Sequence, residues 1–206
     1  VIYLNNDVVA QMSGYKEVLR AFEQETECHL GQVSKDKQFG LYNTPCIGMS
    51  DQEVAAIINH HIFTNLTAKK VKTIITALKE GKKISDISSK VEDNIQKAGP
   101  VFFQSPKKEN GLTKALELSP EEVILEIESS ELRGRGGAGY PTGQKWRATR
   151  QAKGNIKYIV CNADEGEPGT FKDRVLLNKT PEQLFEGMTI AGYAIGAKEG
   201  IIYLRA

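Results

Sequence analysis

The sequence is short of cysteine, of long apolar runs and of any excess of charge of one sign. Its three cysteines, Cys28, Cys46 and Cys161, are too few to hold a four-thiolate iron–sulfur cluster, and they suit a reducing compartment. No apolar run approaches the roughly 18 residues that a membrane-spanning helix needs. The 27 Lys and Arg against 26 Asp and Glu leave a net charge of +1, which gives no sign of a nucleic-acid partner. No secretion signal is visible, although the chain starts at Val1 rather than Met, so we expect a cytoplasmic protein.

Glycine, in contrast, is concentrated in one stretch, Glu131-Leu-Arg-Gly-Arg-Gly-Gly-Ala-Gly-Tyr-Pro-Thr-Gly-Gln-Lys-Trp146. Its five glycines are Gly134, Gly136, Gly137, Gly139 and Gly143. Glycine permits positive φ and lets a ligand approach the backbone, and successive N–H groups in such a turn form a concave anion site. Arg133, Arg135 and Lys145 add the positive charge that suits a phosphate. A merely flexible loop would be rich in Ser and Gly and would not carry aromatic residues and cations in this way.

Two common glycine-loop folds are excluded by what surrounds this stretch. The spacing G-x-G-x-x-G is present, but a dinucleotide fold needs a strand before it and an acid about 20 residues after it. The residues before it predict a helix, because Ser119-Pro-Glu-Glu122 is a capping box with proline at the first helical position. No acid lies between Arg133 and Ala163. The G-x-x-x-x-G-K-[ST] consensus of phosphate-loop NTPases is absent as well.

A second motif follows a predicted strand. Lys157-Tyr-Ile-Val-Cys161 is a short apolar run that predicts a buried strand, and it leads directly into Asn162-Ala-Asp-Glu-Gly-Glu-Pro-Gly169. Ligands of α/β folds bind at the carboxyl ends of strands, and carboxylates with an amide suit hydroxyl groups and the edge of a heterocycle. Alone, this string would indicate a solvated acidic turn. Beside a cationic glycine loop it indicates a nucleotide-like cofactor.

The two motifs, together with Phe171-Lys-Asp-Arg174, resemble the flavin- and NADH-binding subunit of respiratory complex I. They equally resemble its relatives, the NAD(P)-linked subunits of electron-bifurcating hydrogenases and formate dehydrogenases. The resemblance covers roughly the last 95 residues.

This resemblance implies FMN as cofactor and NADH as substrate. The flavin-contacting positions of the family correspond here to Gly134, Arg135, Gly136, Gly137, Lys145, Asn162, Asp164 and Glu165. Tyr140 and Glu167 correspond to positions on the NADH side, and Ala148 replaces a second aromatic residue of the family, which weakens nicotinamide-nucleotide stacking. Hydride transfer to a flavin requires positioning and no general acid, so we expect no catalytic side chain.

Residues 1–83 predict a small α/β domain of thioredoxin-like order. Strands are expected at residues 1–4, 39–42, 53–58 and just after Asn59. One helix is expected where Tyr15, Val18, Leu19 and Phe22 recur on one face. A second helix runs from a Thr67 cap to Gly81.

This domain is similar to the thioredoxin-like 2Fe–2S domain found as a complex I subunit and ahead of the flavin domain in the hydrogenase relatives. The four cysteine positions of that family fall at Asn5, Ala10, Cys46 and Ser50. Only one thiolate remains, and thiolate holds such clusters, so we expect no iron–sulfur cluster and no other metal in this chain. Cys28 is expected in a buried strand. His60 and His61 are expected on opposite faces of a strand.

Residues 84–117 predict a linker, with breakers at 99–100 and 105–106 and an apolar 101–103 segment that packs on one of the domains. Residues 118–206 then predict the first half of an α/β FMN-binding domain, with helices at 171–177 and 181–196 and a strand at 200–204.

We therefore expect part of a flavin-dependent NAD(P)H dehydrogenase subunit that passes electrons to iron–sulfur partner subunits. The alternative is a non-catalytic docking or structural fragment of such a complex.

Overall fold

The computed structural model describes residues 1–95, 99 and 111–204, and these residues form two compact units. Unit 1 takes residues 1–95 and, from much later in the chain, 165–174. Unit 2 takes residues 99, 111–164 and 175–204. The expected breakers at 100 and 105–106 and the packing of 101–103 lie outside the described residues.

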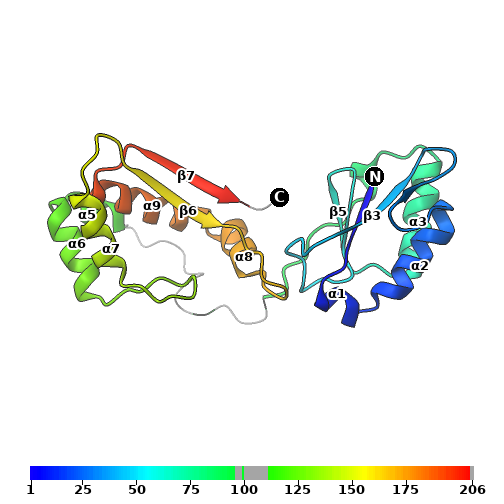
Figure 1. The fold of residues 1–206 in the computed structure, drawn as a ribbon, viewed down its shortest axis with the longest axis horizontal. Coiled ribbons are helices and arrows are strands. Elements are labelled where there is room, and N and C mark those ends of the chain that lie inside the picture. The colour runs from blue at the N-terminus through cyan, green and yellow to red at the C-terminus, as the bar shows by residue number, and fades with distance from the viewer. Residues whose placement is uncertain (96–98, 100–110, 205–206) are drawn as a thin grey trace. The chain divides into compact units, whose positions relative to one another are not determined.

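Unit 1 is built on a five-stranded mixed sheet with strand order β2-β3-β1-β4-β5 (Figure 1). The strands are β1 (Ile2–Asn5), β2 (Gln32–Val33), β3 (Gly40–Thr44), β4 (Ala56–Ile58) and β5 (His61–Phe63). The central strand β1 pairs in parallel with β3, so that Ile2 lies beside Leu41. It pairs antiparallel with β4 on its other edge.

The described helices of this unit are α1 (Val8–Met12), α2 (Tyr15–Thr26), α3 (Ala68–Lys79), α4 (Ile84–Ile87) and the first residues of α8 (Lys172–Lys179), up to Arg174. Helices α2 and α3 lie side by side against the sheet (Figure 1). They bury the apolar faces that their sequences predict, and Val18, Phe22, Val71 and Ile75 are almost completely inaccessible. Thr67 caps α3 as predicted, its hydroxyl oxygen accepting from the Lys70 N–H at 3.3 Å.

The predicted strands and helices of residues 1–83 are confirmed, while the short elements α1 and β2 were not predicted. Two predictions are wrong. Cys28 is buried, but it lies in the irregular segment after α2 rather than in a strand. His60 lies in the β4–β5 turn with φ of 68°, so only His61 is on a strand and the two rings do not alternate across a sheet.

Unit 2 contains the remaining helices and a two-stranded sheet. Its elements are α5 (Gly111–Leu116), α6 (Pro120–Ser129), α7 (Thr142–Gln151), β6 (Tyr158–Ala163), α9 (Pro181–Ile195) and β7 (Glu199–Leu204), together with the end of α8 (Lys172–Lys179) from Val175 onward. The predicted capping box of α6 is present, since the Ser119 N–H donates to Glu122 Oε2 at 2.7 Å and the Glu122 N–H donates to Ser119 Oγ at 3.4 Å. Gly196 ends α9 with a left-handed φ of 78°.

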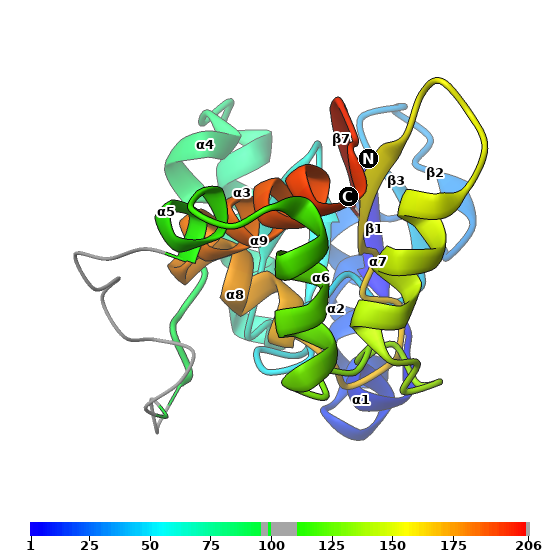
Figure 2. The same cartoon turned by 90° about the vertical axis from the view of Figure 1, so that its left-hand side faces the viewer.

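Helices α6, α7 and α9 enclose the small core of this unit, in which Val123, Ile124 and Ala194 are buried and Trp146 is half-buried. Figure 2 shows α6 and α7 side by side. Arg147 joins them through two hydrogen bonds of 2.7 and 2.6 Å to Glu128. The same guanidinium holds the pKa of the Glu128 carboxyl below its usual range, because it stabilises the ionised form.

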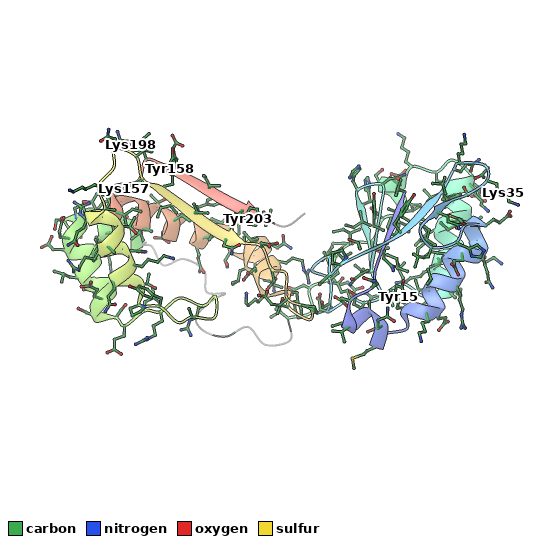
Figure 3. The ribbon with its side chains drawn as sticks, in the orientation of Figure 1. Tyr15, Lys35, Lys157, Tyr158, Lys198 and Tyr203 are labelled. Atoms are coloured by element: carbon green, nitrogen blue, oxygen red, sulfur yellow. The ribbon has the colours of Figure 1, made fainter. Side chains whose placement is uncertain are left out.

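Strands β6 and β7 run parallel, with Val160 opposite Ile201 and Asn162 opposite Tyr203. Helix α9 packs on the pair, and the strand prediction is confirmed, but the prediction that β6 is buried is wrong. Val160 is 61% exposed, and Tyr158 and Tyr203, marked in Figure 3, are about half exposed as well. In the part of the chain that the structure describes, no helix combines the length and the apolar character that crossing a bilayer requires.

Candidate functional site

The glycine-rich stretch folds into a closed loop that leads directly into helix α7. The Gly134 N–H donates to the Tyr140 carbonyl oxygen at 2.9 Å and the Thr142 N–H donates to the Leu132 carbonyl oxygen at 2.8 Å, while Arg133 and Pro141 form an isolated antiparallel bridge. The residues between these contacts bulge into solvent, and Gly134, Arg135, Gly136 and Gly137 are all exposed. An exposed loop at the amino end of a helix directs backbone N–H groups and the positive end of the helix dipole toward a bound anion.

Glycine is required in this region for two different reasons. Gly137 and Gly139 have φ of +110° and +61°, a conformation that other residues adopt only with strain. Gly143, in contrast, lies in α7, and a Cβ there would come within 2.4 Å of Glu128 Cγ and 2.7 Å of the Glu128 backbone nitrogen. The fifth glycine of the motif therefore serves the contact between α6 and α7 rather than the loop.

The cations and the aromatic ring of the motif have different surroundings. The Arg133 guanidinium donates to the Gly139 carbonyl oxygen at 3.1 Å and thereby braces the loop. Arg135 on the loop and Lys145 in the first half of α7 are exposed. The Tyr140 side chain is 55% exposed. The loop and the start of α7 thus offer two solvent-facing cations and one accessible ring close together in the sequence.

The second motif begins at the carboxyl end of β6. Asn162 is the penultimate residue of that strand, and its side-chain oxygen accepts from the Asp164 N–H at 3.1 Å. This side-chain turn holds Asn162 and Asp164 together at the strand end, and both residues are exposed. The predicted position of the motif, at the end of a strand, is confirmed.

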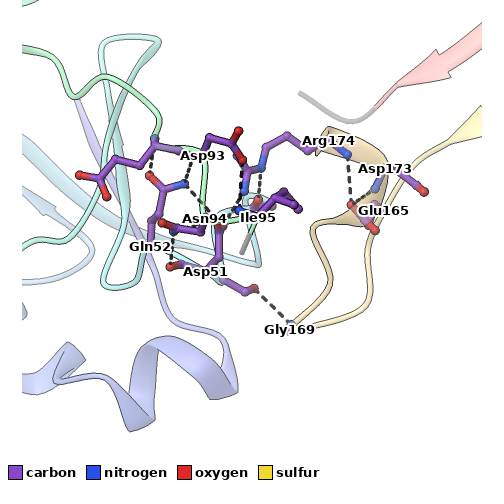
Figure 4. A network of polar contacts seen from close by, with 12 residues as sticks. Asp51, Gln52, Asp93, Asn94, Ile95, Glu165, Gly169, Asp173 and Arg174 are labelled. Atoms are coloured by element: carbon purple, nitrogen blue, oxygen red, sulfur yellow. Dashed lines mark hydrogen bonds and ion pairs between the residues drawn. The ribbon is translucent and has the colours of Figure 1, made fainter. Parts of the chain in front are cut away.

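Glu165 is buried and is the most constrained carboxylate of the motif. Its side chain is 7% exposed, and Oε2 accepts from the Asp173 N–H at 3.0 Å and from the Arg174 N–H at 3.4 Å, at the amino end of α8 (Figure 4). Oε1 is buried as well and forms an ion pair with Lys172 Nζ, 3.3 Å away. A carboxylate oxygen has more than one acceptor site, so Oε1 can accept from a ligand hydroxyl in addition to pairing with Lys172.

Glu167 lies in an exposed turn that its own carbonyl oxygen closes. That oxygen accepts from the Thr170 N–H at 3.1 Å and from the Thr170 hydroxyl at 2.5 Å. Glu165 and Glu167 belong to unit 1, whereas Asn162, Asp164 and the glycine loop belong to unit 2. The acidic motif is therefore divided between the two units, and its members are not all held by the same scaffold.

The four positions that correspond to cluster cysteines lie in unit 1 with mixed surroundings. Asn5 is buried and hydrogen-bonded to Glu53, and Ala10 is completely buried in α1. Cys46 Sγ lies 3.6 Å from Ser50 Oγ. Among residues 1–95, 99 and 111–204, no three His, Cys, Asp or Glu side chains are grouped so that they could hold a metal ion.

Glu53 is the strongly perturbed acid of this region. Burial raises its pKa to about 7, against the opposing effect of hydrogen bonds from Asn5 and from the Ala55 N–H at 2.7 Å. Asp7 and Asp51 raise the pKa further through their negative charges.

Two hollows are lined by described residues of unit 2. One, of about 510 Å³, is lined by α9 and the sheet, including Phe185, Met188 and Ile202. The other, of about 290 Å³, lies at the base of the glycine loop between Glu131, Pro141 and Gln144. The second has the smaller volume, but it adjoins the motif whose chemistry suits a phosphate.

Sequence reasoning missed a set of contacts that join the acidic segment to the loop after Cys46. Arg174 pairs with Asp51, and the Gly169 N–H donates to Ser50. Phe171-Lys-Asp-Arg174 was noticed only as part of the resemblance, and nothing in the local sequence pairs it with residues more than 100 positions earlier.

Comparison with known families matches both parts of the chain. Residues 127–206 match the family described as Nuo51 FMN-binding domain. Residues 1–79 match the family described as thioredoxin-like [2Fe-2S] ferredoxin. These matches confirm the resemblances that the motifs carry and the α/β fold expected of each part.

Individual relatives are similar over different lengths. The α subunit of the NAD-reducing hydrogenase HoxS of Cupriavidus necator is 48% identical over 99% of this chain and 36% of its own length. An NADH-quinone oxidoreductase subunit of Rhizobium meliloti is 54% identical over 46% of this chain and 23% of its own length. A crystal structure of an NAD⁺-reducing [NiFe]-hydrogenase in the H₂-reduced state matches with a TM-score of 0.90 and 34% identity, over 99% of this chain and 37% of that chain. The chain thus spans little more than a third of the hydrogenase relatives that it matches.

Proposed function

Because residues 127–206 match the Nuo51 FMN-binding domain family and residues 1–79 match the thioredoxin-like [2Fe-2S] ferredoxin family, we propose that the chain is part of a flavin-dependent NAD(P)H dehydrogenase subunit. In this role it binds FMN, takes its reducing equivalents from NADH and delivers electrons to iron–sulfur subunits of a multi-subunit complex in the cytoplasm. The proposal includes a thioredoxin-like domain at residues 1–83, a linker at residues 84–117 and a partial FMN-binding domain at residues 118–206. FMN, when bound, supplies the group that accepts a hydride and releases single electrons.

The glycine loop is the observation that carries this proposal. Gly134, Arg135, Gly136 and Gly137 form a closed, solvent-facing loop at the amino end of α7, and this geometry suits the terminal phosphate of FMN. Arg135 and Lys145 supply positive charge beside it. Both cations face solvent, where an incoming phosphate can reach them.

The acidic motif supplies acceptors for the hydroxyl groups of the ribityl chain. Glu165 Oε1 is buried and pairs with the Lys172 ammonium at 3.3 Å, and its remaining acceptor site can take a hydroxyl donor from the cofactor. Asn162 and Asp164 at the end of β6 provide an amide and a further carboxylate. The exposed Glu167 and the 55% exposed ring of Tyr140 are the residues proposed to meet NADH.

Titration of the purified chain with FMN, followed by quenching of flavin fluorescence, tests the proposal. The variants Arg135→Gln and Lys145→Gln should each weaken binding by roughly tenfold, the loss expected for one charge-assisted hydrogen bond. Lys153→Gln is the matched control, because Lys153 is an exposed lysine of the same unit outside the loop. Equal affinities for all four proteins would contradict the assignment of the phosphate to this loop.

We also propose that the thioredoxin-like domain at residues 1–83, called the front domain below, holds no iron–sulfur cluster. The buried Asn5 and Ala10 offer no thiolate, and Ser50 is already engaged by the Gly169 N–H at 3.2 Å. Anaerobic reconstitution with iron and sulfide, followed by visible absorption and EPR spectroscopy, should leave the protein colourless. A stoichiometric 2Fe–2S signal would refute this part of the proposal.

The second candidate function is a non-catalytic docking or structural role within the same type of complex. It is favoured by the replacement of three of the four cysteine positions. NADH-dependent reduction of an artificial acceptor by the FMN-loaded chain would exclude it. If the chain binds FMN but reduces no acceptor until a companion subunit is added, both roles are combined in one protein.

A further inference from the structure

A buried ion pair holds residues 165–174, called the acidic segment below, against the front domain. Arg174 Nη2 lies 2.5 Å from Asp51 Oδ1, and the two side chains are only 16% and 6% exposed. Arg174 Nε also donates to the Gly48 carbonyl oxygen at 3.0 Å. Figure 4 shows this network, all of which belongs to unit 1. A buried pair with additional hydrogen bonds fixes geometry much more strongly than an exposed one.

Asp51 is itself held rigidly from the side opposite Arg174. Its second oxygen, Oδ2, accepts from Gln52 Nε2 and from Asn94 Nδ2, each at 3.1 Å. Gln52 is 1% exposed, and its side-chain amide pairs with the backbone of Glu92 through bonds of 2.9 and 3.1 Å. Both carboxylate oxygens are therefore satisfied, and Asp51 cannot follow Arg174 if the acidic segment moves.

A second contact holds the acidic segment at the turn that contains Gly169. The Gly169 N–H donates to Ser50 Oγ at 3.2 Å, and a Cβ on Gly169 would lie 3.7 Å from Val9 of α1. Ser50 stands at one of the positions where the ferredoxin resemblance expects a cluster cysteine. In this chain its side chain serves instead as the acceptor for the acidic motif.

These two contacts, at Gly169 and Arg174, lie in the same segment as the carboxylates proposed to meet the cofactor and substrate. The Arg174 N–H is one of the two donors to Glu165, so fixing Arg174 also fixes Glu165. The Gly169 contact holds the turn in which the Glu167 carbonyl oxygen bonds to Thr170. The Glu165 carboxylate and the Glu167 backbone are thus linked, through Arg174 and Gly169 respectively, to the loop after Cys46.

We propose that Ser50 and Asp51 are positioning residues that hold the acidic segment, residues 165–174, in the geometry that FMN and NADH require. The front domain, in place of a cluster, then provides the rigid support for Glu165 and Glu167. This inference rests on the proposed function, because FMN and NADH are taken as the ligands. The contacts of Ser50 and Asp51 with the acidic segment can be measured without any ligand.

The test uses the full chain in four forms: wild type, Asp51→Asn, Arg174→Gln and the double variant. Hydrogen exchange should show loss of protection at the amides of Asp173 and Arg174 in each variant. FMN affinity should fall by about tenfold, the loss expected if Glu165 no longer makes one charge-assisted hydrogen bond to the cofactor. The double variant should be no worse than either single one, because both changes break the same contact.

A matched control is Glu80→Gln, which breaks the exposed Lys82–Glu80 pair of the same unit. It should change neither exchange in the acidic segment nor FMN affinity. Ser50→Ala should release Gly169 while leaving the Arg174 amide protected, which separates the two contacts. In all variants the far-UV circular dichroism should match that of the wild type.

Two results would overturn the inference. Unchanged exchange at the Asp173 and Arg174 amides in Asp51→Asn would show that the ion pair does not hold the segment. Lost protection with unchanged FMN affinity would show that the segment is held for a reason unrelated to the cofactor. If the wild-type chain itself fails to bind FMN, the proposed function fails, and the exchange measurement alone decides whether Ser50 and Asp51 hold the segment.

Discussion

Replacing Gly143 by alanine should force helices α6 and α7 apart. A Cβ at this position would lie 2.4 Å from Glu128 Cγ, 2.7 Å from the Glu128 nitrogen and 2.9 Å from its Cα. The side-chain carbon can rotate away, but the two backbone atoms can move only if α6 moves. That movement would also disturb the two hydrogen bonds between Arg147 and Glu128.

The expected magnitude is the difference between two opposing effects. Alanine favours a helix over glycine by about 1 kcal/mol, whereas overpacking costs roughly 1–3 kcal/mol and falls toward the upper end when the obstacle is backbone. We therefore expect Gly143→Ala to lower the free energy of unfolding of unit 2 by about 1–2 kcal/mol. Gly187→Ala is the matched control, because Gly187 lies within α9 and a Cβ there meets nothing within 4 Å. It should raise the same free energy by roughly 0.5–1 kcal/mol.

Urea unfolding followed by tryptophan fluorescence provides the assay. The chain has one tryptophan, and Trp146 lies on α7 against the core of unit 2, so its signal reports this unit. The reasoning predicts midpoint shifts of opposite sign for the two alanine variants with similar m-values. Shifts of the same sign and size would refute the steric explanation, because only helix propensity would then be at work.

Two further predictions concern other parts of the fold. Ser119→Ala removes the capping box of α6 and should destabilise unit 2 by about 1 kcal/mol, measured by the same fluorescence assay; Ser130→Ala, at the other end of the helix, should have the smaller effect. Glu53 has its pKa raised to about 7 by burial, so the folded state holds this proton more tightly than the unfolded state does. The contribution of Glu53 to the stability of unit 1 should therefore be fully present at low pH, decline as pH rises from about 4.5 to about 7, and stay constant above that. Unfolding of Glu53→Gln, followed by circular dichroism at a series of pH values, should lack this decline, and an identical pH dependence in both proteins would show that Glu53 is not its source.

Local signals in the sequence predicted most of the secondary structure. The capping box at Ser119 and the terminal Gly196 marked helix ends correctly, because caps depend on a few adjacent residues. Burial was harder to predict. The apolar run before Cys161 suggested a strand covered on both faces, yet Val160 is 61% exposed, since composition shows that a strand is apolar but not what covers it.

Some features of the candidate site could likewise be predicted from the local sequence, and others could not. The glycine loop is local, and its position after the helix capped by Ser119 and the position of the acidic motif after a strand could be located from the sequence, whereas helix α7, which follows the loop, was not predicted. The different role of Gly143 could not, because the contact that requires it comes from Glu128 on another helix. The pairing of Arg174 with Asp51 was equally invisible, since it joins residues 123 positions apart.

The inclusion of residues 165–174 in unit 1 has a consequence for the order in which the protein is made. The ribosome releases residues 1–95 long before the segment that completes their packing. Until Arg174 emerges, Asp51 has no guanidinium beside it, and joining the two ends requires closure of a long loop whose entropic cost grows only slowly with length. The amino-terminal unit therefore reaches its final form only after most of the second unit has been synthesised, which links the biogenesis of the two halves.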